Sequence, residues 1–335
     1  MRTNAVIAAL AFATAVACGL GAAGSAAQAA GQAPAVVVSL KPVHSLVAGV
    51  MAGVGEPRLL IAGSASPHTY SLRPSDARAL SEAELVFWIG PGMETFLEKP
   101  LESLAGNAEV VTLAEVAGVT LLRSRAGGAW EAHDDGGHGE ADAAHADEDH
   151  GADHETLAHR YGAYNLHIWL DPDNATAIVQ AAVAALSEAD PGRAADYTRN
   201  GEAVIGRLAA LDRELRAELA PVAQAPFVVF HDAYAYFERH YALNAVGSIT
   251  ISPERAPGVQ RLAEIRAKIR ALGAVCVFSE PQFAPRVVGT VAEGTSARQG
   301  ALDPLGVDQP AGPDAYFALM RELAGSLKKC LAVAS

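Results

Sequence analysis

Basic residues, aromatic residues and cysteines are all scarce in this chain. Its 335 residues include 25 lysines and arginines against 38 acidic residues, 6% aromatic residues and three cysteines. The formal net charge is −13, and the sequence contains no basic patch. We therefore expect neither nucleic-acid binding nor attraction to an anionic membrane surface.

The sequence also lacks the local motifs of common enzymes. It contains no His-Glu-x-x-His helix, no Gly-x-Ser-x-Gly elbow and no glycine-rich loop that could cradle a phosphate. These absences favour a binding protein over an enzyme.

Long apolar runs are confined to the amino terminus. Arg2 is followed by an apolar stretch at 5–21 and by the small-residue pattern Ala27-Gln28-Ala29. This order is typical of a secretory signal peptide, so we expect residues 1–30 to be cleaved off near residue 29 or 30 and the mature protein to be periplasmic and soluble. A transmembrane anchor is the alternative. No later segment approaches the roughly 18 consecutive apolar residues of a membrane-spanning helix.

Two cysteines are left after that cleavage. Cys276 and Cys330 are 54 positions apart. An even pair in an oxidising compartment favours a disulfide, which would fasten the predicted last helix, 313–331, to the strand predicted at 274–278. A metal-binding pair is the alternative, although no histidine lies near either cysteine in sequence.

Histidines and acidic residues gather in one segment that has no lysine or arginine. Residues 131–159 hold six of the eleven histidines and ten acidic residues. Ten of the 14 net negative charges of the mature chain lie in this segment, which leaves about −4 for the rest. Because it lacks the apolar side chains of a core, we expect a disordered loop at 124–160 that handles divalent metals. Its candidate ligands are His133, His138, His145, His150, His154 and His159.

Short apolar runs alternate with helical patterns along the mature chain, which is typical of parallel βα units. Strands are expected at 35–39, 58–61, 85–89, 109–113, 166–170, 227–230, 245–249 and 274–278 and just before Leu302, and helices at 45–54, 74–83 and 172–186. Asp190-Pro191 begins about 30 residues of helical pattern that end at Pro221. The sequence thus predicts an α/β protein in which a long helix joins two βα series.

Three histidines outside the loop lie in or after predicted strands. His68 lies beyond the second strand, His167 lies in the run at 166–170, and His231 directly follows the strand at 227–230. Ligands of open α/β sheets bind at the carboxyl ends of strands, and imidazole suits zinc. A lone histidine is usually a structural hydrogen-bonding residue, but three in these positions favour one shared metal site.

The surroundings of these histidines resemble motifs of the ZnuA-type zinc-uptake solute-binding proteins. The matching segments are 63–76, 166–170, 230–237, 278–283 and 302–306. They follow the family's order over nearly the whole mature chain. The family also has a charged, His-rich loop between its first two ligand histidines.

The resemblance implies a periplasmic protein with two βα lobes bridged by a long rigid helix and with Zn²⁺ in the cleft between the lobes. The implied parts are an N-terminal lobe at 31–190, a linking helix at 191–222 and a C-terminal lobe at 223–335. His68, His167 and His231 carry over as metal ligands, and Cys276 with Cys330 fits the family's disulfide. The implied partners are a membrane permease with its cytoplasmic ATPase and a periplasmic zinc chaperone, and we expect a monomer.

The fourth metal ligand is open. Some members of the family have a glutamate immediately before the first ligand histidine, where this chain has Pro67. Asp303 matches a carboxylate ligand of manganese- and zinc-binding relatives and is the candidate, with water as its main competitor. Asp303 could instead cap a turn before Pro304.

The sequence offers several further residues near these motifs. His44, at the end of the first predicted strand, could face the cleft, whereas His240 is expected at the exposed end of a helix. Glu280 is expected either to orient a ligand histidine through its ring N–H or to make a structural contact between the lobes. The remaining expectations are packing of a loop against a helix for Tyr70, Arg73 and Asp76, and core positions for Tyr234, Tyr236 and Phe237.

Other functions are alternatives to zinc uptake. A metal-binding adhesin or surface protein would bind zinc without a transporter, and a transporter component could carry manganese or nickel, because ligand chemistry alone does not rank these metals. A zinc hydrolase has the least support. For the His-rich loop, the hypothesis is low-affinity capture of zinc for the cleft or sensing of abundant metal, and the alternative is a solvated spacer.

Overall fold

The computed structural model describes residues 32–125, 130, 162–250, 258–283 and 286–332. The expected signal peptide and all six histidines of the expected His-rich loop lie outside these residues. Within the described ranges, no helix combines the length and the apolar character that a bilayer span requires.

The first sheet consists of four parallel strands in the order β2-β1-β3-β4. Its strands are β1 (Val36–Val38), β2 (Arg58–Leu59), β3 (Leu85–Trp88) and β4 (Glu109–Thr112). The two central strands are buried at every residue, as parallel strands covered on both faces must be. The helices of this part are α1 (Lys41–Val50), α2 (Pro74–Ser81) and α3 (Glu98–Leu104). Helix α1 begins before the predicted residue 45 because Pro42 lies in its first turn, where proline favours helix initiation.

The segment that contains His167 differs from its prediction. The expected strand at 166–170 is wrong. The chain forms a short antiparallel pair, β5 (Leu122–Arg123) with β6 (Tyr164–Asn165), and then a 3₁₀ turn, η3 (Ile168–Leu170). Asn174 holds this turn, because its Nδ2 donates to the carbonyl oxygen of Ile168 at 3.2 Å. The three apolar residues of the turn are fully buried, so the apolar run reflects burial rather than strand pairing.

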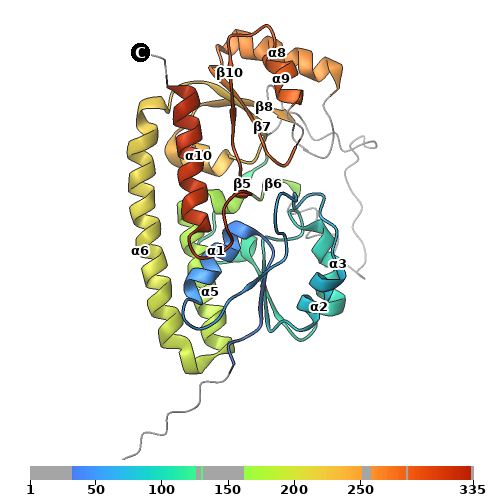
Figure 1. Cartoon of the computed structure of the whole chain (residues 1–335), viewed down its shortest axis with the longest axis vertical. Coiled ribbons are helices and arrows are strands. Elements are labelled where there is room, and N and C mark those ends of the chain that lie inside the picture. Colours follow the sequence, from blue (N-terminus) through green and yellow to red (C-terminus); the bar gives the residue numbers. More distant parts are fainter. Residues whose placement is uncertain (1–31, 126–129, 131–161, 251–257, 284–285, 333–335) are drawn as a thin grey trace, which may run out of the picture. The chain divides into compact units, whose positions relative to one another are not determined.

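A long helix follows, close to its predicted position. Helix α5 (Pro172–Ala189) leads to α6 (Ala194–Leu219), and 3₁₀ turns at Pro191–Arg193 and Ala220–Val222 extend it to the predicted range 191–222. Helix α6 packs against α1, α5 and α10 (Ala315–Leu331), and Figure 1 shows it alongside α10. The α1 backbone approaches α6 closely, because a Cβ at Gly49 would lie 2.7 Å from Val204 Cγ2.

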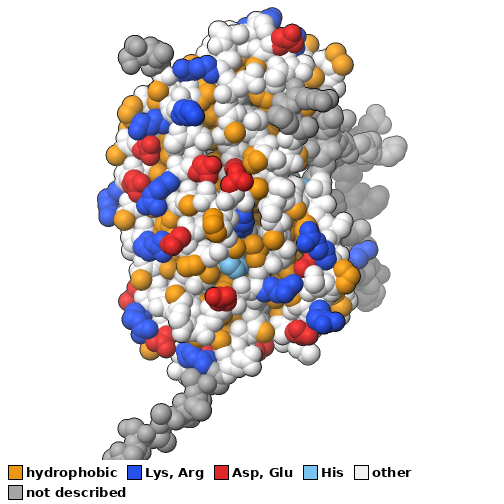
Figure 2. All heavy atoms as spheres, viewed as in Figure 1, with side chains coloured by type: hydrophobic (Ala, Val, Ile, Leu, Met, Phe, Trp, Pro, Cys, Tyr) orange, Lys and Arg blue, Asp and Glu red, His pale blue; other side chains and the backbone are white. Residues whose placement is uncertain are grey.

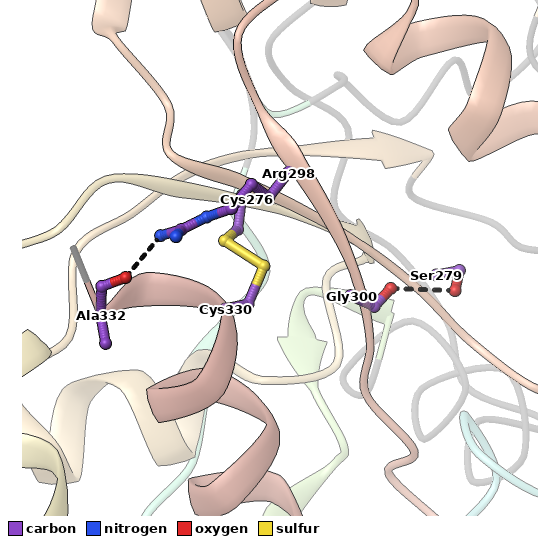
Figure 3. The surroundings of a disulfide bond; sticks show 6 residues. All are labelled: Cys276, Ser279, Arg298, Gly300, Cys330 and Ala332. Atoms are coloured by element: carbon purple, nitrogen blue, oxygen red, sulfur yellow. Dashed lines mark hydrogen bonds between the residues drawn. A yellow bond between two sulfur atoms is a disulfide. The ribbon is translucent and has the colours of Figure 1, made fainter. Parts of the chain in front are cut away.

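The second sheet also has four parallel strands, in the order β10-β9-β7-β8. Its strands are β7 (Phe227–His231), β8 (Ala245–Thr250), β9 (Cys276–Ser279) and β10 (Arg298–Ala301). The accompanying helices are α7 (Ala235–Tyr241), α8 (Val259–Leu272) and α9 (Arg286–Ala292). The predicted disulfide is confirmed: Cys276 of β9 is bonded to Cys330 of α10, with Cα atoms 6.1 Å apart (Figure 3).

The two parallel sheets with their helices and the long α6 confirm the predicted α/β class. By their contacts, residues 32–335 group as one unit, so the lobe boundaries at 190 and 223 stay a prediction. Basic and acidic side chains are mixed over the face shown in Figure 2, which agrees with the near balance of charge expected outside the His-rich segment.

Candidate metal centre

Three histidines that are distant in sequence meet at one point. His68 lies in the loop between β2 and α2, His167 lies between β6 and η3, and His231 is the last residue of β7. Their ring centroids are 5.1 to 6.0 Å apart, and one candidate ligand nitrogen of each lies within 4.8 Å of the other two. The structure thus brings together the three histidines singled out in the sequence.

His231 is oriented by a buried carboxylate. Glu280 directly follows β9, the neighbour of β7 in the sheet, and its Oε1 lies 2.7 Å from Nδ1 of His231. A carboxylate accepts hydrogen bonds, so Nδ1 of His231 carries the proton and Nε2 presents its lone pair. The orienting role considered for Glu280 therefore has a direct geometric basis.

His167 is oriented by an amide. The Oδ1 of Asn165 lies 3.0 Å from both the backbone nitrogen and the Nδ1 of His167. As an acceptor, Oδ1 takes the Nδ1 proton of His167, which again leaves Nε2 as the lone-pair nitrogen. Sequence reasoning did not single out Asn165, and its place two residues before His167 was the available signal.

The two Nε2 atoms face each other. They are 3.2 Å apart. With both ring protons on Nδ1, no hydrogen atom lies between these nitrogens, and their lone pairs repel. Two nitrogen ligands of a tetrahedral zinc, each at about 2.05 Å from the metal, would be about 3.3 Å apart. The observed separation is therefore close to that expected for two nitrogen ligands of one small cation.

Burial keeps two of these histidines in the neutral form that can bind a metal. Burial, and then the neighbouring His231, lowers the pKa of His68 to about 3. Burial also lowers the pKa of His167 well below its usual value, helped by His231 and His68. Because a neutral imidazole is the ligand form, both histidines can bind a divalent cation near pH 7 without first losing a proton.

A cluster of charged residues lies beside the three histidines. A cavity at the site is lined by the three histidines together with Arg125, Asn165 and Asp232. Arg125 pairs with Asp232 and Glu238, and its guanidinium lies 3.4 Å from the centre of the Trp130 ring. Burial opposes the charge of Arg125, but Glu238 and Asp232 outweigh it and raise the pKa of the guanidinium. This cluster, also missed from sequence, fixes the residue that follows His231.

Asp303 is not a member of the histidine group. Its Oδ1 accepts from Gln282 Nε2 at 2.7 Å and from the backbone nitrogen of Leu305 at 2.9 Å, and its Oδ2 accepts from the backbone nitrogen of Val307. These contacts are those of the turn cap considered as its alternative role. Among the residues that the structure describes, the group consists of three histidines.

The other two histidines lie elsewhere. His44 lies inside α1 rather than at a strand end, where its Nε2 donates to the carbonyl oxygen of Pro57 at 2.9 Å. The expectation that His240 is an exposed residue is wrong. Its side chain is only 6% exposed, because the end of α7 lies against Asp171 at the start of α5 and Asp212 of α6.

The packing roles expected for the first motif and for the aromatic set are confirmed. Asp76 caps the start of α2 by accepting from the backbone nitrogen of Arg73 at 3.1 Å, and the hydroxyl of Tyr70 donates to the same oxygen at 2.8 Å. The three aromatic residues expected in the core are at most 2% exposed, namely Tyr234, Tyr236 and Phe237.

Comparisons with known proteins place the chain in a family. Residues 36–330 match the family model described as zinc-uptake complex component A, periplasmic. The high-affinity zinc uptake system protein ZnuA of Brucella abortus is 51% identical over 315 residues, which cover 90% of this chain and 93% of that protein. A zinc-bound ZnuA deletion mutant has a similar fold, with a TM-score of 0.71, 24% identity, and 90% of this chain and 98% of that one covered. The periplasmic zinc-binding protein TroA of Treponema pallidum gives a TM-score of 0.72 at 20% identity, with 90% and 99% covered.

Proposed function

Because the chain belongs to the family of periplasmic zinc-uptake complex components, we propose that it captures Zn²⁺ outside the cytoplasm and delivers it to an ABC permease for import. Zinc is the transported cargo. The bound state uses Nε2 of His167, Nε2 of His231 and a ring nitrogen of His68 as ligands.

One observation carries this proposal. The Nε2 atoms of His167 and His231 are 3.2 Å apart, and each faces the site with its lone pair because its Nδ1 proton is donated to Asn165 or Glu280. Three neutral imidazoles suit the borderline character of zinc better than that of manganese, which prefers oxygen ligands. Asp303 already accepts hydrogen bonds from two backbone nitrogens of its own turn and from the side chain of Gln282, which favours water at the fourth position.

The proposal includes the partners and the location that the family implies. The protein is exported with cleavage near residue 29 or 30, works as a monomer, and meets a permease that is driven by a cytoplasmic ATPase. A periplasmic zinc chaperone is a further proposed partner. A solute-binding component releases its cargo chemically unchanged, so we propose no catalytic activity.

Metal analysis of the purified mature protein tests the proposal. We expect one tightly bound zinc per chain, and we expect His68→Ala, His167→Ala and His231→Ala each to lose it. His44→Ala is the matched control, because His44 is also a buried histidine but lies outside the group. Asp303→Asn tests whether the fourth ligand is the Asp303 carboxylate or water. A large loss of zinc affinity is expected only if the carboxylate is the ligand.

Deletion of residues 131–159 is the complementary test of where the tight zinc site lies. The deletion variant should keep the tight zinc and lose only weaker binding. Retention of tight zinc in all three alanine variants, together with its loss in the deletion variant, would place the site in the His-rich segment and overturn the proposal.

A further inference from the structure

We propose that Asn165 is a positioning residue for the zinc site, which fixes the tautomer of His167 and ties this histidine to the strand end that carries His231. The inference rests on the proposed function, because it names the residue that prepares one of the zinc ligands. Asn165 is itself buried, with 7% of its surface exposed.

The orientation of the Asn165 amide follows from its neighbours. One end of the amide faces the backbone N–H of His167, which can only donate, so this end is the oxygen. The other end faces the backbone carbonyl of Asp232, which can only accept, so this end is the nitrogen. Both neighbours demand the same assignment, and a flipped amide would lose both hydrogen bonds.

The fixed amide decides where the ring proton of His167 lies. Since the end of the amide beside the ring is its oxygen, 3.0 Å from Nδ1, the proton of the neutral ring belongs on Nδ1. The opposite tautomer would set the lone pair of Nδ1 against the lone pairs of this oxygen and place a proton on Nε2. That proton would point at Nε2 of His231, where the zinc has to bind.

The same side chain also holds the two ligand-bearing segments together. Its nitrogen donates to the backbone carbonyl of Asp232, the residue after His231. From the second part of the chain, the hydroxyl of Tyr236 in α7 donates to the backbone oxygen of Asn165 at 2.5 Å. The Nε of Arg125 donates to both carboxylate oxygens of Asp232. Asn165 therefore links the segment that contains His167 to the end of the strand that carries His231.

Asn174 offers a matched control for a test. It is a second buried asparagine, 1% exposed, that also holds the segment after β6. Its Oδ1 accepts from the backbone nitrogen of Thr120 at 2.8 Å, and its Nδ2 donates to the carbonyl oxygens of Thr120 and Ile168 at 3.1 and 3.2 Å. Its side chain thus makes three hydrogen bonds to backbone groups, against two for the side chain of Asn165, without a contact to a histidine ring.

The experiment compares Asn165→Leu, Asn165→Asp and Asn174→Leu with the unmodified mature protein. Long-range ¹H–¹⁵N spectra of the metal-free proteins report the tautomer of His167, and competition with a chelator reports the zinc affinity. We expect Asn165→Leu to populate the Nε2–H tautomer and to bind zinc about 10- to 100-fold more weakly, the usual cost of losing a partner of a metal-bound histidine. Asn165→Asp, which keeps an acceptor beside Nδ1, should keep the Nδ1–H tautomer. Asn174→Leu should also keep this tautomer and should lose less zinc affinity than Asn165→Leu.

Two results would overturn the inference. One is an Nδ1–H tautomer in Asn165→Leu, and the other is a loss of zinc affinity in that variant no greater than in Asn174→Leu. If Asn165→Leu does not fold, an Nε2–H tautomer in Asn165→Asp overturns it instead. The proposed function fails separately, because absence of tight zinc in the unmodified protein contradicts zinc capture while the tautomer is still measured without metal.

Discussion

At the residue scale, the acceptor beside Nδ1 prepares each of two histidines for metal binding. Glu280 serves His231 and Asn165 serves His167, so one partner can carry a negative charge and the other is neutral. A negative partner makes an imidazole a stronger donor to a metal than a neutral partner does. We therefore expect His231 to contribute more to zinc affinity than His167.

Replacement of Glu280 by glutamine tests the role of this charge. Glutamine can still accept the Nδ1 proton of His231 through its oxygen but cannot be negatively charged, so the tautomer should persist while the zinc affinity falls. We expect zinc to bind about 10-fold more weakly, at the lower end of the range for such partners. Chelator competition measures this affinity, and Glu280→Leu, which also removes the acceptor, should lose more.

Glu94 provides the control for that measurement. It is another fully buried carboxyl group, bonded to Ser39 and to the backbone nitrogens of Ile89 and Gly90, and burial raises its pKa to about 7. Glu94→Gln should leave the zinc affinity unchanged. Equal losses of affinity in Glu94→Gln and Glu280→Gln would mean that the effect of Glu280 is a general loss of stability.

The sequence was informative about the ligand histidines and less so about their surroundings. His68, His167 and His231 lie in motifs that resemble a known family, and their positions after short apolar runs predicted convergence. The contacts of Asn165 with Asp232 and of Arg125 with Asp232 join residues 67 and 107 positions apart. A single sequence gives no signal for such pairs. For the same reason it could not show that Asp171 and Asp212 cover His240.

At the element scale, prediction was most accurate where burial of apolar side chains dominates. The buried central strands and the long amphipathic helix α6 lie close to their expected positions, because their apolar pattern alone determines them. The strand predicted at 166–170 was wrong because two side-chain hydrogen bonds to its backbone compete with strand pairing. Asn165 accepts from the backbone nitrogen of His167, and Asn174 donates to the carbonyl oxygen of Ile168.

Three helices meet at His240, and this contact should make stability depend on pH. Nδ1 of His240 in α7 lies 3.2 Å from Asp171 at the start of α5, and its Nε2 lies 2.7 Å from Asp212 of α6. Burial acts to lower the pKa of His240, but the hydrogen bonds with these two carboxylates outweigh it and raise the pKa above 6.5. Arg216 of α6 completes the contact, with its Nη2 2.8 Å from Nε2 of His240.

The sign of the pH dependence follows from this raised pKa. A group with a higher pKa in the folded state stabilises the fold fully below its unfolded pKa and loses that contribution as the pH rises through its folded pKa. Urea unfolding at several pH values should therefore show that His240→Gln destabilises the protein more at pH 5.5 than at pH 8.5. A destabilisation that is equal at both pH values, or larger at pH 8.5, contradicts this assignment.

The disulfide joins β9 to α10, and its removal should lower stability without affecting zinc. Figure 3 shows a second link beside it, where Arg298 donates to the carbonyl oxygen of Ala332 at 2.8 Å. For a separation of 54 residues, loss of the cross-link should lower the free energy of unfolding by at most about 4 kcal/mol in the chain-entropy model. Urea unfolding of the Cys276→Ala, Cys330→Ala double variant measures this loss. An unchanged unfolding midpoint contradicts the prediction, and chelator competition checks that zinc affinity is retained.

At the scale of the whole molecule, the three histidines of the candidate metal centre join distant segments of the fold. His68 lies between β2 of the first sheet and α2, His167 follows β6 of the β5-β6 pair, and His231 ends β7 of the second sheet. The Nε2 atoms of His167 and His231 lie 3.2 Å apart, a separation that one bound cation would bridge. A cation bound to all three histidines therefore links both sheets and should stabilise them together.

Zinc should raise the stability of the whole protein by mass action. A ligand that binds only the folded state, present at 100 times its dissociation constant, adds about 2.7 kcal/mol to the free energy of unfolding. Thermal unfolding of the mature protein, recorded with zinc and with a chelator, should show one transition that moves to higher temperature with zinc. His231→Ala should abolish this increase and His44→Ala should retain it. Since His231 is the ligand contributed by the second sheet, an undiminished zinc effect in His231→Ala would mean that the stabilising metal binds within the first part alone.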